Sequence, residues 1–412
     1  MTHVCASRLD SRLRALAGFG ALPGGGVSRA AWSPAHEAAR AWLVAEIRSA
    51  GLEAWIDPAG NTFGGLGARS FQADHPVIVT GSHIDTVPEG GTLDGALGVI
   101  AGLECLQTVR EAGIRPARPL AVAAWSDEEG RYGSLFGSRA FAGNLDVARI
   151  PDLASLDGDR LVDAMRRAGF DALHAPEARA PAGSVAAYVE LHIEQGARLE
   201  EAGLHIGIVD RIVGVRRARI VFSGQADHAG TTPMDRRRDA FLAAADFALQ
   251  ARALITTDGS PVTVSNIGYV AVYPGAANVV PGRTELIHEM RDPDPGVLAR
   301  LTPAVEALAT AVASTRGIGV EIRPLSATAP TSFAERVMAA AETACDRLGL
   351  KAQRLYSAAG HDAQNLARIT DAGMIFIPSK GGRSHRVDET SEAVDIERGA
   401  NVLLHTLLAL AG

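Results

Sequence analysis

The first half of the chain alternates short apolar segments with stretches of helical spacing, and this alternation limits the fold more than any other feature. The clearest apolar segments are PVIVTGS (76–82), PLAVAAWS (119–126) and SVAAYVELHI (184–193), and Ala96 to Val109 has helical composition. Apolar runs of this length between helices are typical of strands buried on both faces of a sheet. The pattern therefore predicts an α/β domain with a mostly parallel sheet flanked by helices.

From about Ile212 to Leu325 the pattern changes to alternating strands, RRARIVFSG, PVTVSNIGYV and GRTELIHEMR. Two helical stretches, Arg238 to Leu254 and Pro295 to Ser314, separate them. This β-α-β-β-α-β order predicts a smaller α+β domain, in which two helices cover one face of an antiparallel sheet.

After this region a helical stretch (Phe333 to Leu348) and the apolar run GMIFIPS (373–379) resume the first pattern. The 412 residues also exceed the length at which a single core usually stops growing. We therefore expect residues 1–211 and 326–412 to form one larger domain, into which residues 212–325 are inserted.

The charge of the chain excludes some partners. A formal net charge of -7 argues against nucleic acid or an anionic membrane as the main partner, because both attract basic surfaces. The three cysteines are odd in number and far apart, which argues against a disulfide framework. No apolar run approaches membrane-spanning length and the N-terminus lacks a signal-peptide core, so we expect a cytoplasmic protein.

The segment GSHIDTVPEGGTLDGALG places His83, Asp85 and Asp94 in or beside glycine-rich turns at the end of a predicted strand. An imidazole can bind a transition metal, and a carboxylate can bridge two cations through its two oxygens. Asp85 could orient the imidazole of His83. The alternative interpretation is a turn whose polar side chains bond only to the backbone.

A second predicted strand ends in SDEEG, which presents Glu128 and Glu129 side by side. Successive side chains of an extended backbone point in opposite directions, so one carboxylate can bind metal while the other faces a substrate. Without the other motifs, a solvated acidic turn explains the pair equally well.

The remaining candidates follow two further strands: His192, Glu194 and Gln195 in ELHIEQG, and His385 in GGRSHRVDE. A single histidine after an apolar run is more often a hydrogen-bonded structural residue than a ligand. Four strand ends of one sheet, however, each supply His, Asp or Glu, and ligands in open α/β sheets bind at the carboxyl ends of the strands. This combined placement favours a site for paired zinc or manganese ions.

These segments resemble the hydantoinase/carbamoylase branch of the di-zinc aminoacylase-like metallopeptidases, which contains N-carbamoyl-L-amino acid hydrolases, β-ureidopropionases and allantoate amidohydrolases. The matching blocks run in the family's order from about residue 60 to 390: GSHIDTVPEGGTLDG, DEEG, GSRA, ELHIEQG, ADHAGTTPM, NVVPG, AGHDAQ and SH. HIEQG and DHAGTTPM separate the branch from the true peptidases. The resemblance implies hydrolysis of the linear C–N bond of an N-carbamoyl amino acid or related ureido carboxylate, with release of ammonia and carbon dioxide.

The resemblance also implies two divalent metal ions in each subunit, zinc or manganese, with nickel or cobalt as alternatives. His83, Asp94 and His192 would hold the first ion. Asp94 would bridge to the second, which Glu129 and His385 also hold. Two such ions lower the pKa of a shared water toward neutrality, and Glu128 would be the general base that accepts its proton.

The residues that the resemblance places against the substrate are Gln195 at the carbamoyl end, His228 at the scissile carbonyl, Asn278 and Arg291 at the carboxylate, and Gly360 in the pocket wall. In these enzymes the counterparts of His228, Asn278 and Arg291 come from the neighbouring subunit. The resemblance therefore implies a homodimer that assembles through the inserted domain, which also acts as a lid. Arg383 and Arg386 flank His385 and could select a substrate with a second acidic group, although solvent-exposed arginines are the commoner case.

Other functions remain open at this point. A dipeptidase or N-acyl-amino-acid deacylase of the same fold would use the same metals, and HIEQG argues against it. A non-catalytic relative that binds metal is the other class of alternative. No G-x-S-x-G motif supports a serine hydrolase, and no G-x-G-x-x-G follows a strand to support dinucleotide binding.

Overall fold

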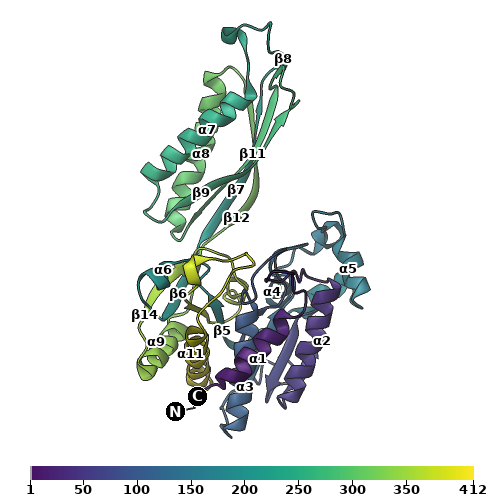
Figure 1. Cartoon of the computed structure of the whole chain (residues 1–412), viewed down its shortest axis with the longest axis vertical. Helices are drawn as coiled ribbons and strands as arrows, with labels where there is room; N and C mark the ends of the chain where they lie inside the picture. Colours follow the sequence, from purple (N-terminus) through teal and green to yellow (C-terminus); the bar gives the residue numbers. More distant parts are fainter. Residues whose placement is uncertain (1) are drawn as a thin grey trace. The chain divides into compact units, whose positions relative to one another are not determined.

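The computed structural model describes residues 2–412, which divide into two compact units (Figure 1). Unit 1 contains the chain up to Asp210 together with Ser332–Gly412, and unit 2 is Arg211–Thr331. The chain leaves unit 1 and returns to it, so unit 2 is an insertion. The fold confirms the expected α/β class with a smaller antiparallel α+β part.

The second junction lies beyond the boundary expected from the sequence. Leu325 is inside strand β12 (Gly319–Thr328), which pairs with β7 (Gly214–Ser223) along its length. The pairing register shifts between Pro324 and Ser326, and Leu325 is exposed. At this irregularity the alternation of partly buried and exposed residues is interrupted, so the junction expected from the sequence falls inside the strand.

The sheet of unit 1 has nine strands in the order β1-β2-β4-β3-β5-β15-β6-β13, with β14 also paired to β6. The strands are β1 (Glu53–Ile56), β2 (Thr62–Leu66), β3 (Val77–His83), β4 (Leu120–Trp125), β5 (Val185–Ile193), β6 (Ile206–Ile212), β13 (Thr331–Ser332), β14 (Ala352–Ser357) and β15 (Ala372–Ile377). The four central strands β4, β3, β5 and β15 are parallel, and antiparallel strands flank them on both sides. Every residue of β3, β4 and β15 is buried, which explains their continuous apolar sequences.

Helices cover both faces of this sheet. The helices of unit 1 are α1 (Ala6–Ala17), α2 (Pro34–Ser49), α3 (Ala96–Glu111), α4 (Phe136–Ala142), α5 (Leu161–Arg167), α6 (Arg198–Glu201), α9 (Glu335–Leu348), α10 (Ala363–Leu366) and α11 (Ala393–Ala411), with 3-10 turns η1 (Val147–Asp152), η2 (Ala172–Ala178) and η4 (Lys380–Gly382). The helices α1, α2, α3, α9 and α11 share one core with one face of the strands. A second core beneath α4, α5, η1 and η2 forms around Trp32, Phe136 and Met165.

Unit 2 contains a four-stranded antiparallel sheet in the order β12-β7-β11-β9. Strands β9 (Val264–Tyr273) and β11 (Arg283–Asp292) belong to this sheet. Unit 2 also contains β8 (Asp227–His228), η3 (Met234–Arg236), α7 (Ala240–Asp258), β10 (Val279–Val280) and α8 (Pro295–Thr315). Side chains of α7 and α8 pack on one face of the sheet in a single core that includes Phe222, Phe247 and Leu286. Asp239 and Asp294 cap the N-termini of α7 and α8 through backbone N–H groups, which fixes where the two helices begin.

Helix α8 corrects one expectation from the sequence. By length and composition it is the one helix in the described part of the chain that could cross a membrane. Its Val297, Leu298, Leu301 and Val305 are buried in the core of unit 2, and that packing accounts for its apolar composition. The three cysteines are all free.

Candidate metal centre and active site

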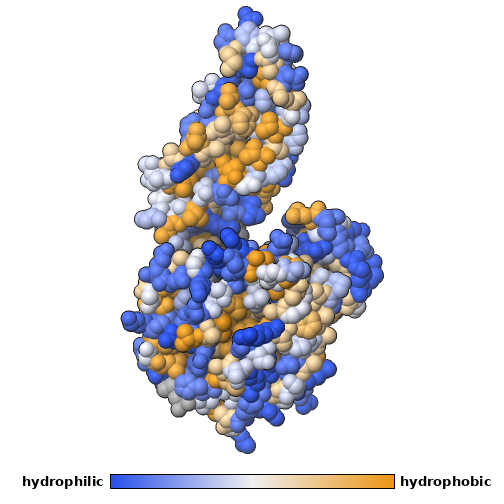
Figure 2. All heavy atoms as spheres, in the orientation of Figure 1, coloured by the Kyte–Doolittle hydropathy of each residue, from blue (hydrophilic) through white to orange (hydrophobic). Residues whose placement is uncertain are grey.

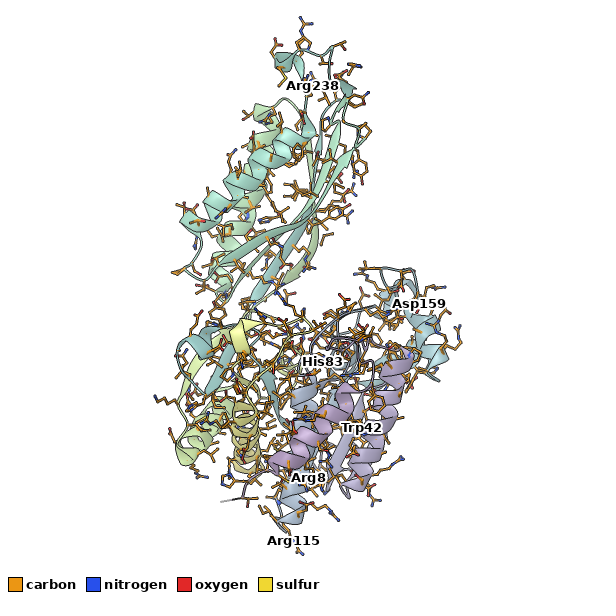
Figure 3. The ribbon with its side chains drawn as sticks, in the orientation of Figure 1. Arg8, Trp42, His83, Arg115, Asp159 and Arg238 are labelled. Carbon is orange, nitrogen blue, oxygen red and sulfur yellow. The ribbon has the colours of Figure 1, made fainter. Side chains whose placement is uncertain are left out.

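The ends of the four parallel strands bring the predicted ligands to one edge of the unit 1 sheet. His83 is the last residue of β3 (Figure 3), and His192 lies one residue before the end of β5. Glu128 and Glu129 follow β4, and His385 lies in the loop after β15. Parallel strands direct their carboxyl ends to the same edge, so residues far apart in sequence become neighbours.

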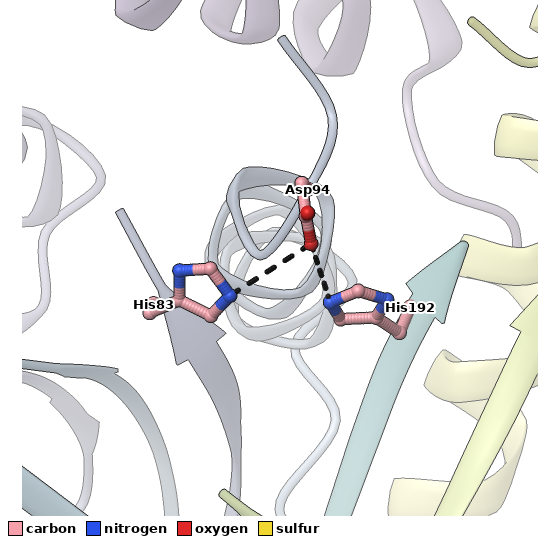
Figure 4. A group of neighbouring side chains, drawn as sticks. All are labelled: His83, Asp94 and His192. Atoms are coloured by element: carbon pink, nitrogen blue, oxygen red, sulfur yellow. Dashed lines mark ion pairs between the residues drawn. The ribbon is translucent and has the colours of Figure 1, made fainter. Parts of the chain in front are cut away.

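One group of potential metal ligands consists of His83, Asp94 and His192 (Figure 4). Oδ1 of Asp94 lies 3.1 Å from Nε2 of His192 and 3.9 Å from Nε2 of His83. Two ligands of one tetrahedral zinc ion lie about 3.4 Å apart, because each is about 2.1 Å from the metal. The three atoms thus have the spacing that a single ion requires.

A second group uses the other oxygen of Asp94. Oδ2 of Asp94 lies 3.2 Å from Nε2 of His385, which is 3.8 Å from Oε2 of Glu129. The remaining oxygen of Glu129, Oε1, is buried and has no hydrogen-bond partner among the described residues. Because Asp94 contributes one oxygen to each group, the donor set fits two neighbouring cations that share a carboxylate.

The charges in this cluster depend strongly on one another. Burial opposes ionisation of Asp94, but hydrogen bonds from His192 and His385 outweigh it and hold the pKa of Asp94 well below its usual value. Burial alone would lower the pKa of His192, but the hydrogen bond to Asp94 and its negative charge outweigh burial and raise this pKa to about 9. The hydrogen bond to Asp94 likewise raises the pKa of His385 to about 9. The two imidazoles therefore hold protons where metal ions would bind.

The cluster contains more acidic side chains than protonated imidazoles. Burial, followed by the negative charges of Asp362 and Glu129, raises the pKa of Glu128 well above its usual value. Burial and the charge of Asp94 raise the pKa of Glu129 to about 7. Buried carboxylates that repel one another in this way are stabilised by divalent cations, so the chemistry of the donor set also fits metal binding. Oε2 of Glu128 lies 3.6 Å from Nε2 of His83, beside the first group of ligands.

Asp85 has a different partner from the one expected. Its main-chain oxygen, rather than its carboxylate, lies 2.9 Å from Nδ1 of His83, and the carboxylate is 3.8 Å away. The carboxylate instead accepts hydrogen bonds from the backbone N–H groups of Glu128 and Glu129, at 3.3 and 3.1 Å. Asp85 therefore fixes the imidazole through the backbone and the acidic turn through its side chain. The sequence could not separate these roles, because the turn after β4 is distant in the chain.

Gly95 makes room for the first ligand group. It precedes α3 with φ of 65°, and a Cβ atom there would lie 2.4 Å from Nε2 of His83. Any other residue would displace the imidazole, so this position requires glycine.

Gln195 also reaches the metal centre. Its Nε2 donates hydrogen bonds to Oδ2 of Asp94 at 3.1 Å and to Oγ of Ser384 at 3.2 Å, while its Oε1 is buried without a partner among the described residues. Gln195, Asp127 and His385 have positive φ values of 60°, 51° and 57°. Such conformations are costly for residues with a side chain, and they concentrate at functional sites.

Glu389 was not recognised from the sequence, although it connects the two loops that carry ligands. Its Oε1 accepts hydrogen bonds from the backbone N–H groups of Leu93 and Asp94, at 3.3 and 3.0 Å. Its Oε2 accepts from Oγ of Ser384 at 2.8 Å and from the N–H of His385 at 3.3 Å. One buried carboxylate thus positions both Asp94 and His385. The only sequence signal was an acid four residues after a candidate histidine.

A buried polar group behind His192 was also missed. The rings of His192 and His361 contact each other edge to face, with centroids 4.5 Å apart, and Glu190 lies in the same cluster. Glu190 accepts hydrogen bonds from Oγ of Ser82 at 2.7 Å and from the N–H of Ala363 at 2.9 Å. These residues lie in matched segments, but apolar neighbours in the sequence gave no sign that Glu190 points inward.

The predicted residues of unit 2 do not form one group. Strand β8 pairs with β10, so that His228 is opposite Val279, and the N–H of Ala229 donates to the carbonyl of Asn278 at 2.9 Å. His228 and Asn278 are therefore neighbours, and both are exposed. Arg291 lies near the opposite end of β11 from the β10 connection, where it pairs with Val215 and contacts Glu289 at 2.7 Å. The sheet separates Arg291 from the other two.

The two arginines beside His385 already form ion pairs within the chain. Arg383 and Arg386 are both exposed, and each forms an ion pair with Asp388. Both side chains therefore face solvent, which is the commoner of the two cases expected from the sequence. Gly360 is exposed and lies directly before His361, at the start of the segment that leads to α10.

The fold and this donor set fit a class of enzymes that bind metal ions, and comparisons with known proteins identify the family. Residues 79–409 match the model of peptidase family M20/M25/M40. The chain is 40% identical over 407 residues to an N-carbamoyl-L-amino acid amidohydrolase of Geobacillus stearothermophilus, with 98% of each chain covered. It is 34% identical over 405 residues to the allantoate amidohydrolase of Escherichia coli, with 98% of this chain and 97% of that relative covered.

Among solved structures, a hydantoinase/carbamoylase family amidase from Burkholderia multivorans superimposes with a TM-score of 0.89 at 35% identity, and the match covers 100% of this chain and 98% of that one. The chain belongs to peptidase family M20/M25/M40 and, within it, to the hydantoinase/carbamoylase branch. It is an enzyme, a hydrolase that acts on non-peptide C–N bonds, as the sequence resemblance implied.

Proposed function

We propose that this protein uses two divalent metal ions to hydrolyse the carbamoyl group of N-carbamoyl-L-amino acids, with release of ammonia and carbon dioxide. The observation that carries the proposal is the pair of ligand groups that share Asp94, one oxygen to each. Zinc and manganese suit this mixture of imidazole and carboxylate ligands, with nickel or cobalt as alternatives. Bound there, the ions would supply Lewis acidity and a water of lowered pKa.

In this proposal, Glu128 accepts a proton from the attacking water and passes it to the leaving nitrogen. Glu128 is suited to this role because its side chain is buried, lies beside the ligands and makes no hydrogen bond with another side chain in the described residues that would occupy it. Gln195, whose amide already reaches Asp94, would orient the carbamoyl end of the substrate.

Residues of unit 2 would bind the rest of the substrate. His228 would polarise the scissile carbonyl, and Asn278 and Arg291 would hold the carboxylate, Arg291 through a charge-assisted hydrogen bond. Because His228 and Asn278 lie at the opposite end of the sheet from Arg291, one copy of unit 2 would serve two different sites. We propose that His228 and Asn278 complete the site of a second subunit.

This arrangement requires a homodimer, and the edge of unit 2 supports one. Strand β9 is at the edge of its sheet, and Val264, Tyr269, Val270 and Tyr273 on it are exposed. The adjacent helix α7 exposes Phe241, Leu242 and Leu249, and Figure 2 shows apolar surface on this unit. An exposed apolar edge strand is a template for pairing with another chain. Light scattering should give the mass of a dimer for the protein and of a monomer for a variant with Leu249→Glu and Val270→Lys.

The activity is tested with protein that has been stripped of metal and then reloaded with zinc or manganese. Ammonia release should be absent from the stripped protein and present after reloading, with N-carbamoyl-L-amino acids as substrates. Allantoate is the second candidate, because the Escherichia coli relative named above is an allantoate amidohydrolase. A dipeptide and an N-acetyl amino acid complete the panel, and faster cleavage of either would contradict the proposal in favour of a peptidase or deacylase.

A further inference from the structure

A pocket in unit 1 adjoins the metal centre but contains none of the residues expected to touch the reacting group except Glu129. Its volume is about 390 Å³, and its wall includes Ala30, Ala31, Val87, Pro88 and Leu156. A cavity of about 150 Å³ is enough for a benzene ring, so this pocket can hold a large amino-acid side chain. Glu129 belongs both to this wall and to the second ligand group, so the pocket begins where the proposed site ends.

Three of the four charged residues in the wall, Asp85, Arg131 and Asp157, already have partners, and the fourth, Glu129, belongs to the second ligand group. The carboxylate of Asp85 accepts hydrogen bonds from two backbone N–H groups of the acidic turn. Nη2 of Arg131 lies 3.2 Å from Oδ2 of Asp157, and its guanidinium covers the ring of Tyr132 at 5.5 Å. Oγ1 of Thr86 accepts a hydrogen bond from the backbone N–H of Arg29 at 2.8 Å. The pocket therefore offers a ligand mainly apolar surface, with few polar groups to bind a second ureido group.

Leu156 is the most exposed large apolar side chain of the described residues, and it stands at the rim of this pocket. The loop that carries it is ordered by its own hydrogen bonds. The N–H of Ser155 donates to the carbonyl of Asp159 at 2.9 Å, and the N–H of Gly158 donates to the carbonyl of Ser155 at 3.0 Å. A leucine held in solvent by a tight turn would become buried when an apolar group occupies the pocket.

The segments that carry Ala30, Ala31 and Val87 are also held in place. The N–H of Thr86 donates to the carbonyl of Arg29 at 3.0 Å, and the guanidinium of Arg29 donates to the carbonyl of Ile84 at 2.6 Å. These bonds tie the segment that carries Ala30 and Ala31 to the loop that carries Val87. Hydrogen bonds therefore fix these segments of the pocket wall as well as the loop of Leu156.

We infer that this pocket binds the side chain of the substrate and that it selects N-carbamoyl-L-amino acids with large apolar side chains over N-carbamoylglycine and allantoate. This inference rests on the proposed function and specifies the substrate class. An apolar pocket of this kind gains affinity with each methylene it buries, and it leaves the polar groups of allantoate without partners.

The test compares kcat/KM for N-carbamoyl-L-leucine, N-carbamoylglycine and allantoate. The wild-type enzyme should prefer the leucine derivative by at least about tenfold over the glycine derivative, because the extra methylenes lie in the pocket. Leu156→Ser should lower kcat/KM for the leucine derivative by about tenfold and leave N-carbamoylglycine unchanged. Ala30→Phe, which fills the pocket, should have the same selective effect.

The matched control is Leu173→Ser, which removes another exposed leucine of unit 1 that does not line the pocket and should change neither substrate. Equal rates of the wild type on the leucine and glycine derivatives would overturn the subsite while leaving the proposed function standing. An equal loss on both substrates in Leu156→Ser would do the same. If the metal-loaded enzyme hydrolyses neither carbamoyl amino acid, the proposed function fails, and this inference fails with it.

Discussion

Unit 1 and unit 2 hold their candidate functional residues in opposite ways. In unit 1, His83, Asp94 and His192 are buried and lie within hydrogen-bonding or ligand distance of one another. In unit 2, His228 and Asn278 are exposed at one end of the sheet, and Arg291 lies at the other. Unit 1 therefore brings a set of potential metal ligands together in one place, whereas the candidate residues of unit 2 are divided between the two ends of its sheet.

The largest expected effect tests the unit 1 side of this comparison. Glu128→Gln should lower kcat about a thousandfold or more, because the variant cannot accept a proton, while both metal ions stay bound. Metal content by atomic emission and ammonia release from the same preparation provide the measurement. Glu177→Gln, at an exposed position, is the control and should behave as the wild type. Appreciable turnover by Glu128→Gln would remove the assigned base.

The next effect tests whether unit 2 acts on a second subunit. His228→Ala should lower kcat about a hundredfold by removing a group that polarises the carbonyl, with metal content unchanged. Mixing this variant with Glu128→Gln should restore about a quarter of wild-type activity, because half of randomly formed dimers contain one intact site. Two inactive variants that stay inactive after subunit exchange would contradict the shared site.

A smaller effect, on metal affinity, is expected when Glu389 in unit 1 is substituted. Glu389→Gln should weaken metal binding roughly tenfold to a hundredfold, because an amide cannot accept all the hydrogen bonds that now position Asp94 and His385. Competition with a chelator of known affinity measures the change. Glu392→Gln, on the same segment but exposed and paired with Lys380, should bind metal as the wild type does.

Arg291→Ala should raise KM for carboxylate substrates roughly tenfold to a hundredfold, the range for a lost hydrogen bond to a charged group. Its kcat should fall less than that of His228→Ala, since Arg291 is proposed to bind the carboxylate away from the scissile bond. The saturation kinetics of the two variants on one substrate therefore compare the two ends of unit 2. An unchanged KM would eliminate the proposed role of Arg291.

The smallest effect concerns pH. The pKa of His192 and that of His385 are raised to about 9 in the metal-free protein, so both imidazoles carry protons at pH 7.5. Their pairing with Asp94 stabilises the metal-free fold fully below the unfolded pKa of about 6.5 and is lost as the pH rises through about 9. Metal binding should release about two protons at pH 7.5, since ligands must be neutral imidazoles. Calorimetric titration in two buffers of different ionisation enthalpy measures the release, and no release would contradict the pairing.

The sequence by itself determined the class of fold. Continuous apolar runs predicted buried strands, alternating runs predicted the antiparallel sheet, and the observed helices α3, α8 and α9 begin within two residues of their expected starts. These predictions succeeded because burial and helix capping leave a local mark on each segment. Glycine-rich turns and acidic pairs after the strands likewise marked His83, Asp94, Glu128 and Glu129 as candidates for chemistry.

Only the tertiary structure decided which of these atoms meet. In the structure, Asp94 contributes one oxygen to each ligand group, and the carboxylate of Asp85 accepts hydrogen bonds from the acidic turn after β4. Glu389 connects two loops that lie nearly 300 residues apart in sequence. The structure also separates Arg291 from His228 by the length of a strand. Local sequence records the periodicity of burial, but the distance between two side chains depends on strand order and register, which are set by contacts across the whole chain.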